Sequence, residues 1–334
     1  MMRSNYRRRS RHEFGDINMD LKLPRSFHIS EEVARSLSMQ WPVVALESTV
    51  ITHGLPYPQN LELARDMEND IRSLGVTPAT IAVLDGTIQV GVLPEQLERL
   101  ALAEGMHKIS VREYGPAVAQ GWSGGTTVAG TMLAAHRAGI RVFATGGIGG
   151  VHRSLGISHS QPFDISADLQ MLARTPMIVV CAGAKAILDL PATLEYLETF
   201  SVPVAGYQTD DFPAFYSRTS GFKASVRVDS ALEVVELARA HWGWGLQSAV
   251  LVANPPPEAI ALPAERVDGA IQQALRDAQA QGVRGQQVTP FLLGRVAELT
   301  GGASLQANLG LLRNNARLAA EIAVEMAEGG VVLA

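Results

Sequence analysis

The chain has 334 residues, with 28 lysines and arginines against 33 aspartates and glutamates, and therefore a formal net charge of −5. A hydrophobic content of 47% allows a large core and excludes a wholly disordered chain, and the small negative charge argues against duplex nucleic acid as the main partner. The single cysteine, Cys181, excludes an intrachain disulfide and favours a reducing, cytoplasmic location.

We expect residues 1–24 to form a disordered N-terminal extension, or to stem from a misassigned start codon, and residues 25–334 to form a single domain. The extension contains five arginines but no apolar stretch of the kind found in a secretory signal. Glu13, Asp16 and Asp20 disfavour a transit peptide. No run of about 18 apolar residues occurs, so the sequence predicts no membrane-spanning segment.

Short runs rich in β-branched residues alternate with helical patterns from residue 42 onwards. Most of these runs show no alternation of polar and apolar residues, which is typical of strands buried on both faces of a parallel sheet. The predicted strands are 42–47, 80–84, 88–92, 141–145, 177–181, 203–207 and 249–253.

The segments between these strands have helical spacing. For example, Leu61, Ala64, Met67, Ile71 and Leu74 recur every three or four residues and form one apolar stripe. The predicted helices are 60–74, 94–103, 126–138, 185–200, 231–242, 264–281, 289–299 and 305–327. Alternating strands and helices predict an α/β protein with a three-layer α/β/α fold and a mostly parallel central sheet.

Lys185 follows the apolar run MIVVCAGA, which reads as a buried strand and a turn of small residues. This places an amine near the carboxyl end of a strand, where open α/β sheets bind ligands. Apolar surroundings favour the neutral amine, which can attack a carbonyl and form a Schiff base. The alternative is an ordinary lysine at the start of a helix, with its amine in solvent.

Glu47 ends the apolar run VVAL and precedes Ser48 and Thr49. A carboxyl group at the end of a buried strand tends to have a raised pKa, which suits a proton donor. The alternative is a carboxylate that caps a nearby turn.

Asp164 and Asp168 flank Ser166 in the segment DISAD. In a helix the two carboxylates would share a face, and such oxygen ligands suit Mg²⁺ or Mn²⁺. The alternative is helix capping, with Asp164 at the N-cap and Asp168 as a charge in the first turn.

Two glycine-rich segments, GGTT at 124–127 and GGIGG at 146–150, adjoin predicted elements. Backbone N–H groups and hydroxyls before the helix at 126–138 would suit a phosphate. Neither segment completes a dinucleotide or Walker motif, so a small phosphorylated molecule fits better than NAD or ATP. The alternative for each is a tight turn that needs positive φ.

His53 and His152 lie next to glycines and could either contact a ligand or be structural. Cys181 is interpreted as a small buried hydrophobic residue.

Together these segments resemble one family, the pseudouridine-5′-phosphate glycosidases, also called indigoidine synthase A-like proteins. The resemblance covers residues 25–330 in order. The matching segments are ALESTVITHGLP (45–56), PATIAVLDG (78–86), GGTTVA (124–129), FATGGIGGVHR (143–153), DISADL (164–169), VCAGAK (180–185), AGYQTD (205–210), NP (254–255), TPFLL (289–293) and SLQAN (304–308).

The resemblance implies a carbon–oxygen lyase that cleaves the C–C glycosidic bond of pseudouridine 5′-phosphate to uracil and ribose 5-phosphate, in pseudouridine catabolism. It implies a divalent metal, usually Mn²⁺ but also Mg²⁺, and a homotrimer. By the same resemblance Glu47 is the proton donor, Lys185 the nucleophile that holds ring-opened ribose as an iminium, and Asp164 the metal ligand. The implied substrate-binding residues are Lys108, Val128, Ser166, Ala167, Asp168 and the uracil-contacting Asn308.

The sequence departs from the family at two places. Glu113 stands where the family usually has aspartate, and the tract 154–162 is longer than usual. Neither change affects Glu47 or Lys185. Two other functions share part of this pattern. A Schiff-base lyase or aldolase that acts on another sugar phosphate would use Lys185 but would need no pyrimidine site at Asn308. A sugar-phosphate sensor would need a partner-binding module, which the sequence does not show.

Overall fold

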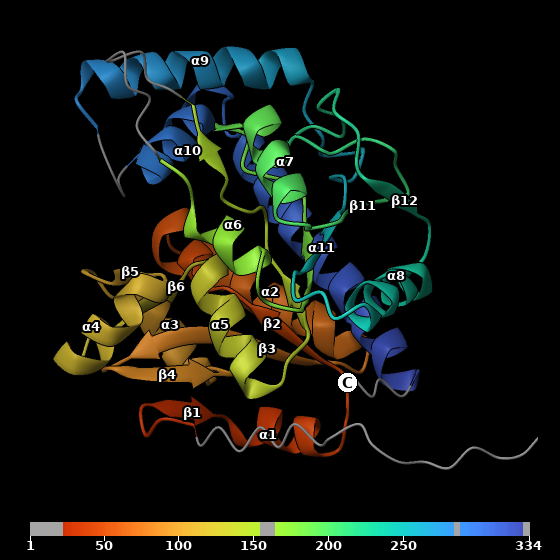
Figure 1. Cartoon of the computed structure of the whole chain (residues 1–334). Coiled ribbons are helices and arrows are strands. Elements are labelled where there is room, and N and C mark those ends of the chain that lie inside the picture. Colours follow the sequence, from red (N-terminus) through yellow and green to blue (C-terminus); the bar gives the residue numbers. More distant parts are fainter. Residues whose placement is uncertain (1–22, 154–163, 284–287, 330–334) are drawn as a thin grey trace, which may run out of the picture.

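The computed structural model describes residues 23–153, 164–283 and 288–329, and its central feature is a mixed sheet with the strand order β1-β4-β3-β2-β7-β9-β13-β11-β12 (Figure 1). All neighbours from β3 to β12 along this order are parallel. The main sheet also contains β5 and β6, with β6 antiparallel to β3. The strands are β1 Phe27–Ile29, β2 Val43–Leu46, β3 Thr77–Leu84, β4 Thr87–Val90, β5 His107–Ile109, β6 Gly124–Thr126, β7 Val142–Ala144, β9 Ile178–Cys181, β11 Val204–Tyr207, β12 Val226–Val228 and β13 Val250–Ala253. The predicted mostly parallel sheet is confirmed.

Helices cover both faces of this sheet, as the uninterrupted apolar strands predict. Figure 1 shows α5 and α6 in front of the sheet and α2 and α11 behind it, and α11 packs on β2, β7 and β9. All residues of β2, β7, β9 and β13 are buried. The helices are α1 Glu31–Ser38, α2 Gln59–Ser73, α3 Pro94–Leu102, α4 Tyr114–Gln120, α5 Val128–Ala138, α6 Ala167–Leu172, α7 Leu190–Thr199, α8 Ala231–Gly243, α9 Ala264–Ala280, α10 Val288–Leu299 and α11 Ala303–Glu328.

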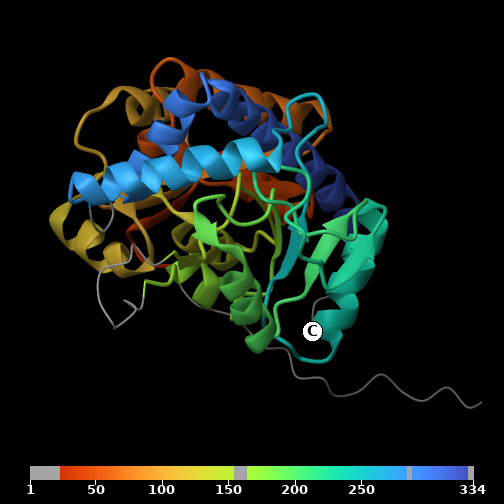
Figure 2. The ribbon, with the colours of Figure 1, turned by 90° about the horizontal axis from the view of Figure 1, so that it is seen from above.

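Smaller elements complete the structure. A second sheet pairs β8 Val151–His152 with β10 Leu188–Asp189 in antiparallel fashion, and a π-helical turn spans Val50–Gly54. Figures 1 and 2 show α9 lying across one end of the molecule beside α10. No helix in the described ranges combines the length and the apolar character that a membrane crossing requires.

Two sequence expectations fall outside the described residues. Of the N-terminal extension predicted over 1–24, the structure describes only the last two residues, and the long tract at 154–162 lies in an undescribed range.

The helix predicted over 185–200 begins later, at Leu190. Asp189 is its N-cap, because its side chain accepts a hydrogen bond from Ala192 N, and Pro191 fits the first turn. Lys185 therefore lies in a turn before β10, not at a helix start, and the interpretation of it as a helix-start lysine is wrong.

The glycines of GGTT lie in a strand, so the alternative interpretation of this segment, a tight turn with positive φ, is also wrong. Gly124 and Gly125 lie in β6 with ordinary φ values, and the helix starts only after Thr127, its N-cap. A Cβ atom at Gly124 would lie 2.0 Å from the carbonyl oxygen of His107 on β5. Close approach of two backbones, not turn geometry, therefore requires glycine here.

We predict that Gly124→Ala lowers the free energy of unfolding by about 3 kcal/mol, the upper part of the range for overpacking, because the backbone of β5 has no room to yield. Urea unfolding followed by circular dichroism measures the change. Gly115→Ala is the matched control: this glycine lies in α4 with no atom within 4 Å of an added Cβ, so the same substitution should be neutral or stabilising. Equal behaviour of the two variants would contradict the close-approach argument.

Candidate active site

A cavity lies where the parallel strands β2, β7 and β9 end. Glu47 directly follows β2, and Lys185 follows β9 after a short turn. Both side chains line the cavity, together with Lys108 from β5 and Asn308 from α11. The carboxyl edge of the parallel strands thus brings Glu47 and Lys185 into one cavity, as expected for such a sheet, and β5 and α11 add Lys108 and Asn308.

The Glu47 side chain is enclosed by the fold. The residue is only 8% exposed, and one carboxylate oxygen accepts a hydrogen bond from the Thr145 hydroxyl. Burial raises the pKa of Glu47, while the positive charges of Lys185 and Lys108 and the Thr145 hydrogen bond act in the opposite direction. The environment therefore favours a carboxyl group that holds its proton longer than an ordinary glutamate does.

The turn that carries Lys185 is fixed by its backbone. Lys185 N donates to Ile148 O at 3.0 Å, and Lys185 O accepts from Leu188 N at 3.0 Å. Gly183 precedes it with φ +89°, and a Cβ atom there would lie 2.2 Å from Pro213 O. The amine is thus presented from a turn with few ways to rearrange.

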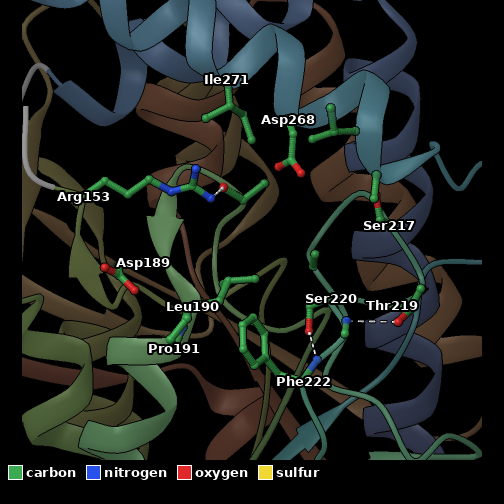
Figure 3. A pocket seen from close by; sticks show the side chains of 15 residues that line it. Arg153, Asp189, Leu190, Pro191, Ser217, Thr219, Ser220, Phe222, Asp268 and Ile271 are labelled. Atoms are coloured by element: carbon green, nitrogen blue, oxygen red, sulfur yellow. Dashed lines mark hydrogen bonds between the residues drawn. The ribbon is translucent and has the colours of Figure 1, made fainter.

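Arg153 holds the same turn from the opposite side. Its Nε donates to Leu188 O at 2.9 Å and its Nη2 to Ala186 O at 3.4 Å. Figure 3 shows this side chain at the edge of a second hollow, of about 650 Å³, between the start of α7, the segment 217–222 and α9. Ala186 faces this hollow while Lys185 faces the cavity, so the turn separates the two spaces.

Lys108 places a second amine beside the first. Burial lowers the pKa of Lys108 and the charge of Lys185 lowers it further, while the carboxylates of Asp168, Glu47 and Glu113 act in the opposite direction. Glu113, the departure from the family pattern, also accepts a hydrogen bond from Ser110 N at 3.1 Å.

The DISAD segment is arranged differently from the prediction. The helix α6 starts at Ala167 with Ser166 as its N-cap, so Asp164 precedes the helix and is not its cap. Asp164 and Asp168 therefore share no helix face, and that prediction is wrong. Asp168 does lie in the first turn, as the capping alternative stated.

Both carboxylate oxygens of Asp168 accept hydrogen bonds from backbone amides. Oδ1 accepts from Ala129 N at 2.9 Å and Oδ2 from Gly149 N at 2.8 Å, and the residue is 5% exposed. Asp168 thereby joins the N-terminus of α5 to the loop 146–150 and the start of α6. Val128, Ser166 and Ala167 lie at these two helix starts, beside the cavity lining but outside it.

Asp164 offers an accessible carboxylate. Its side chain is 58% exposed, and Oδ2 lies 3.9 Å from His152 Nδ1. The described ranges contain no group of three or more His, Cys, Asp or Glu side chains that could surround a metal ion. This donor set suits only a hard cation that keeps most of its water, as Mg²⁺ does at sites with one or two carboxylates.

The remaining predictions concern residues near the cavity. His53 lines it, and burial lowers its pKa, so the ring is neutral at neutral pH. Cys181 is fully buried and burial raises its pKa to about 12, which confirms it as an inert small hydrophobe. The glycines of 146–150 have ordinary φ values: close approach, such as 2.3 Å from a Cβ at Gly149 to Ser166 Oγ, explains them, not positive φ.

The sequence interpretation missed Thr145 and Phe215. Phe215 lines the cavity, and its ring would lie 2.6 Å from a Cβ at Gly147. Thr145 is the last residue of a predicted strand, as Glu47 is of another, so its position at the sheet edge could have marked it as a candidate site residue.

Comparisons with known proteins show which family the chain resembles. The family model described as indigoidine synthase A like protein matches residues 32–325. The chain is 54% identical to the pseudouridine-5′-phosphate glycosidase of Geobacillus kaustophilus over 297 residues, 89% of this chain and 97% of the relative. It is also 54% identical to the Escherichia coli protein of that name over 308 residues, 92% of this chain and 97% of the relative.

Two solved structures have the same architecture. The prealnumycin C-glycosynthase AlnA, in complex with ribulose 5-phosphate, superposes with a TM-score of 0.83 at 40% identity, covering 92% of this chain and 99% of that one. An indigoidine synthase A-like protein from Thermotoga maritima superposes with a TM-score of 0.81 at 36% identity, covering 90% and 96%.

We predict that Glu47→Gln stabilises the fold at mildly alkaline pH. Because burial raises the pKa of Glu47 above its ordinary 4.5, the native state favours the neutral form, and that advantage is lost as the pH rises through the raised pKa. Glutamine stays neutral, so the variant should unfold at higher urea than wild type in alkali, and the gap should close as the pH falls towards 4.5. The exposed Glu258→Gln is the control. A gap that is absent, or independent of pH, would count against a buried, proton-retaining carboxyl.

Proposed function

The chain belongs to the indigoidine synthase A like family, and we propose that it cleaves the C–C glycosidic bond of pseudouridine 5′-phosphate, reversibly, to uracil and ribose 5-phosphate. The observation that carries this proposal is the meeting of the Lys185 amine and the buried Glu47 carboxyl in one cavity. The ribulose 5-phosphate in the structure of the C-glycosynthase relative supports a sugar phosphate as ligand.

A C–C glycosidic bond has no heteroatom that can leave with the electron pair, so the two-carboxylate arrangement of ordinary glycosidases does not transfer to it. A lysine solves this problem: its amine bonds to C1′ as the C1′–O4′ bond breaks and the ribose ring opens, with the amine proton passing to O4′. When the C1′–C5 bond then breaks, its electron pair passes to the uracil ring, which takes up a proton at C5. The amine nitrogen then shares its lone pair with C1′, which gives an iminium. Water hydrolyses that iminium to ribose 5-phosphate and frees Lys185.

Glu47 supplies the proton that this route needs at C5 of uracil. Its burial and its place in the same cavity as Lys185 support that role, because a proton donor must keep its proton until the leaving base requires it. In the reverse direction the same carboxylate takes the proton back.

The phosphate fits the side of the site where Lys108 lies near the starts of α5 and α6. The Lys108 amine attracts a phosphate when it is protonated, and backbone N–H groups at Val128 and Ala167 would add hydrogen bonds. The N–H of Ser166 already donates to Gly150 O, so Ser166 would contribute through its hydroxyl. The side-chain oxygens of Asp168 accept from Ala129 and Gly149, and its backbone N–H donates to Ser166 Oγ, so Asp168 would hold the two helix starts in place around the phosphate. Asn308, 9% exposed in the cavity wall, provides an amide for the uracil edge.

Asp164 would hold a divalent cation, Mn²⁺ or Mg²⁺, through its single accessible carboxylate, with water completing the coordination. Such an ion would supply positive charge near the substrate. A homotrimer and a cytoplasmic location are also proposed, on the family resemblance and the single cysteine.

A Schiff-base aldolase that acts on another sugar phosphate is the second candidate, because it would use the same Lys185. The cavity argues against it, since Asn308 and the neutral His53 add polar groups that a small aldol acceptor does not need.

Reductive trapping tests the covalent step. Borohydride added with ribose 5-phosphate should fix the sugar phosphate on wild-type protein, and mass spectrometry should locate it on Lys185. Lys185→Ala should lose the label, while the exposed control Lys223→Ala should keep it. Labelling of Lys185→Ala at the wild-type rate would refute the assignment.

Metal removal tests Asp164. EDTA should abolish uracil release and Mn²⁺ should restore it, whereas Asp164→Asn should bind Mn²⁺ more weakly in paramagnetic resonance titrations, because an amide carries no charge. Asp210→Asn removes an exposed carboxylate elsewhere and should change nothing. Wild-type Mn²⁺ affinity in Asp164→Asn would show that the ion binds elsewhere.

A further inference from the structure

A chain of buried hydrogen bonds leads from helix α11 to the catalytic carboxyl. Asn254 Nδ2, after β13, donates to Asn315 Oδ1 on α11 at 3.0 Å. Asn315 Nδ2 donates to Thr145 O at 2.9 Å and lies 3.5 Å from Gly146 O. The Thr145 hydroxyl then donates to Glu47. Asn315 is 1% exposed and Thr145 is 1% exposed, so the link between these two residues is shielded from water.

In this series of hydrogen bonds, the link from Asn315 to the backbone of Thr145 carries the argument. Asn315 donates to the Thr145 carbonyl directly after β7, where the loop 146–150 begins. Gly146 O also accepts from Ala182 N at 2.9 Å, but without Asn315 the Thr145 carbonyl oxygen would lose the amide that donates to it. Because the peptide of Thr145 sets the direction of its side chain, the amide also fixes where the hydroxyl points.

We propose that Asn315 is a positioning residue, which holds the Thr145 peptide so that the Thr145 hydroxyl stays on the Glu47 carboxyl during the reaction. This inference rests on the proposed function, in which Glu47 gives the proton. Asn315 itself touches neither substrate nor the reacting atoms, and Asn254 holds its amide in the donating orientation.

The direction of the expected pH effect follows from the hydrogen bond. A hydroxyl that donates to Glu47 favours the carboxylate, so its loss lets the group keep its proton to higher pH. The other charges that face Glu47 come from Lys185, Lys108 and Asp168, and none of them is changed by a substitution on α11. The alkaline limb of kcat, which reports the enzyme–substrate complex, is therefore the measurement of choice.

A double-mutant cycle separates positioning from mere stabilisation. Asn315→Leu and Thr145→Val should each lower kcat by about 10- to 100-fold with KM changed little, as expected for a displaced catalytic group. Each should also move the alkaline limb of kcat upwards, by about one pH unit for a charge-assisted hydrogen bond. The double variant should be no worse than Thr145→Val alone, and Thr145→Ser, which keeps the hydroxyl, should restore the wild-type limb.

Asn314→Leu is the matched control. Within the described part of the chain, the Asn314 side chain donates a single long hydrogen bond, from Nδ2 to Pro255 O at 3.5 Å, so its loss should leave kcat and its pH profile unchanged. If Asn315→Leu is insoluble, Asn315→Ala, which adds no apolar bulk, takes its place. Additive losses in the cycle, or an unmoved alkaline limb in Asn315→Leu, would overturn the proposal. Failure of wild-type protein to release uracil would instead reject the proposed function, so the two failures are distinct.

Discussion

Glu47 is a carboxyl group in a space that water barely reaches, with the Thr145 hydroxyl on one oxygen and two lysine amines nearby. Removing such a group from water is unfavourable, and the fold offsets the loss with a hydrogen bond and with nearby positive charge. The result is a carboxyl that is neither permanently neutral nor permanently ionised. The rest of the site is arranged around this carboxyl group, because the proton donor and the Lys185 amine share one cavity.

The fold holds the site residues in place through backbone segments that lie closer together than a side chain at the glycine positions would allow. Gly124 lies against the backbone of β5, and Gly183 lies against Pro213 before the turn of Lys185. Asp168 joins the start of α5 to the loop 146–150 with two backbone amides. These contacts leave little freedom to the elements that carry Lys108 and Lys185, and preorganised groups need no rearrangement when charge moves.

The sequence predicted the elements with strong apolar patterns and the residues at their ends. The central strands, their parallel arrangement and the positions of Glu47 and Lys185 at the sheet edge all followed from local sequence. It could not predict the start of α7, because the competing capping by Asp189 and Pro191 outweighs an otherwise continuous helical pattern. Nor could it predict the link from Asn315 to Thr145, which are 170 residues apart and meet only in the folded chain. The role of Asp168 shows the same limit: the spacing of DISAD permits a shared helix face, and only the position of the Ser166 cap excludes it.

The central claim is that Lys185 and Glu47 act in succession, the amine before the acid. The most direct test is borohydride trapping of the sugar phosphate on the Glu47→Gln variant, starting either from ribose 5-phosphate or from pseudouridine 5′-phosphate. From ribose 5-phosphate, the variant should be labelled to the wild-type extent, because forming the iminium needs only the amine. From pseudouridine 5′-phosphate, it should yield almost no ribose phosphate label, because the C–C bond does not break without the proton. Equal labelling from both compounds would contradict the account and move the proton donor to another residue.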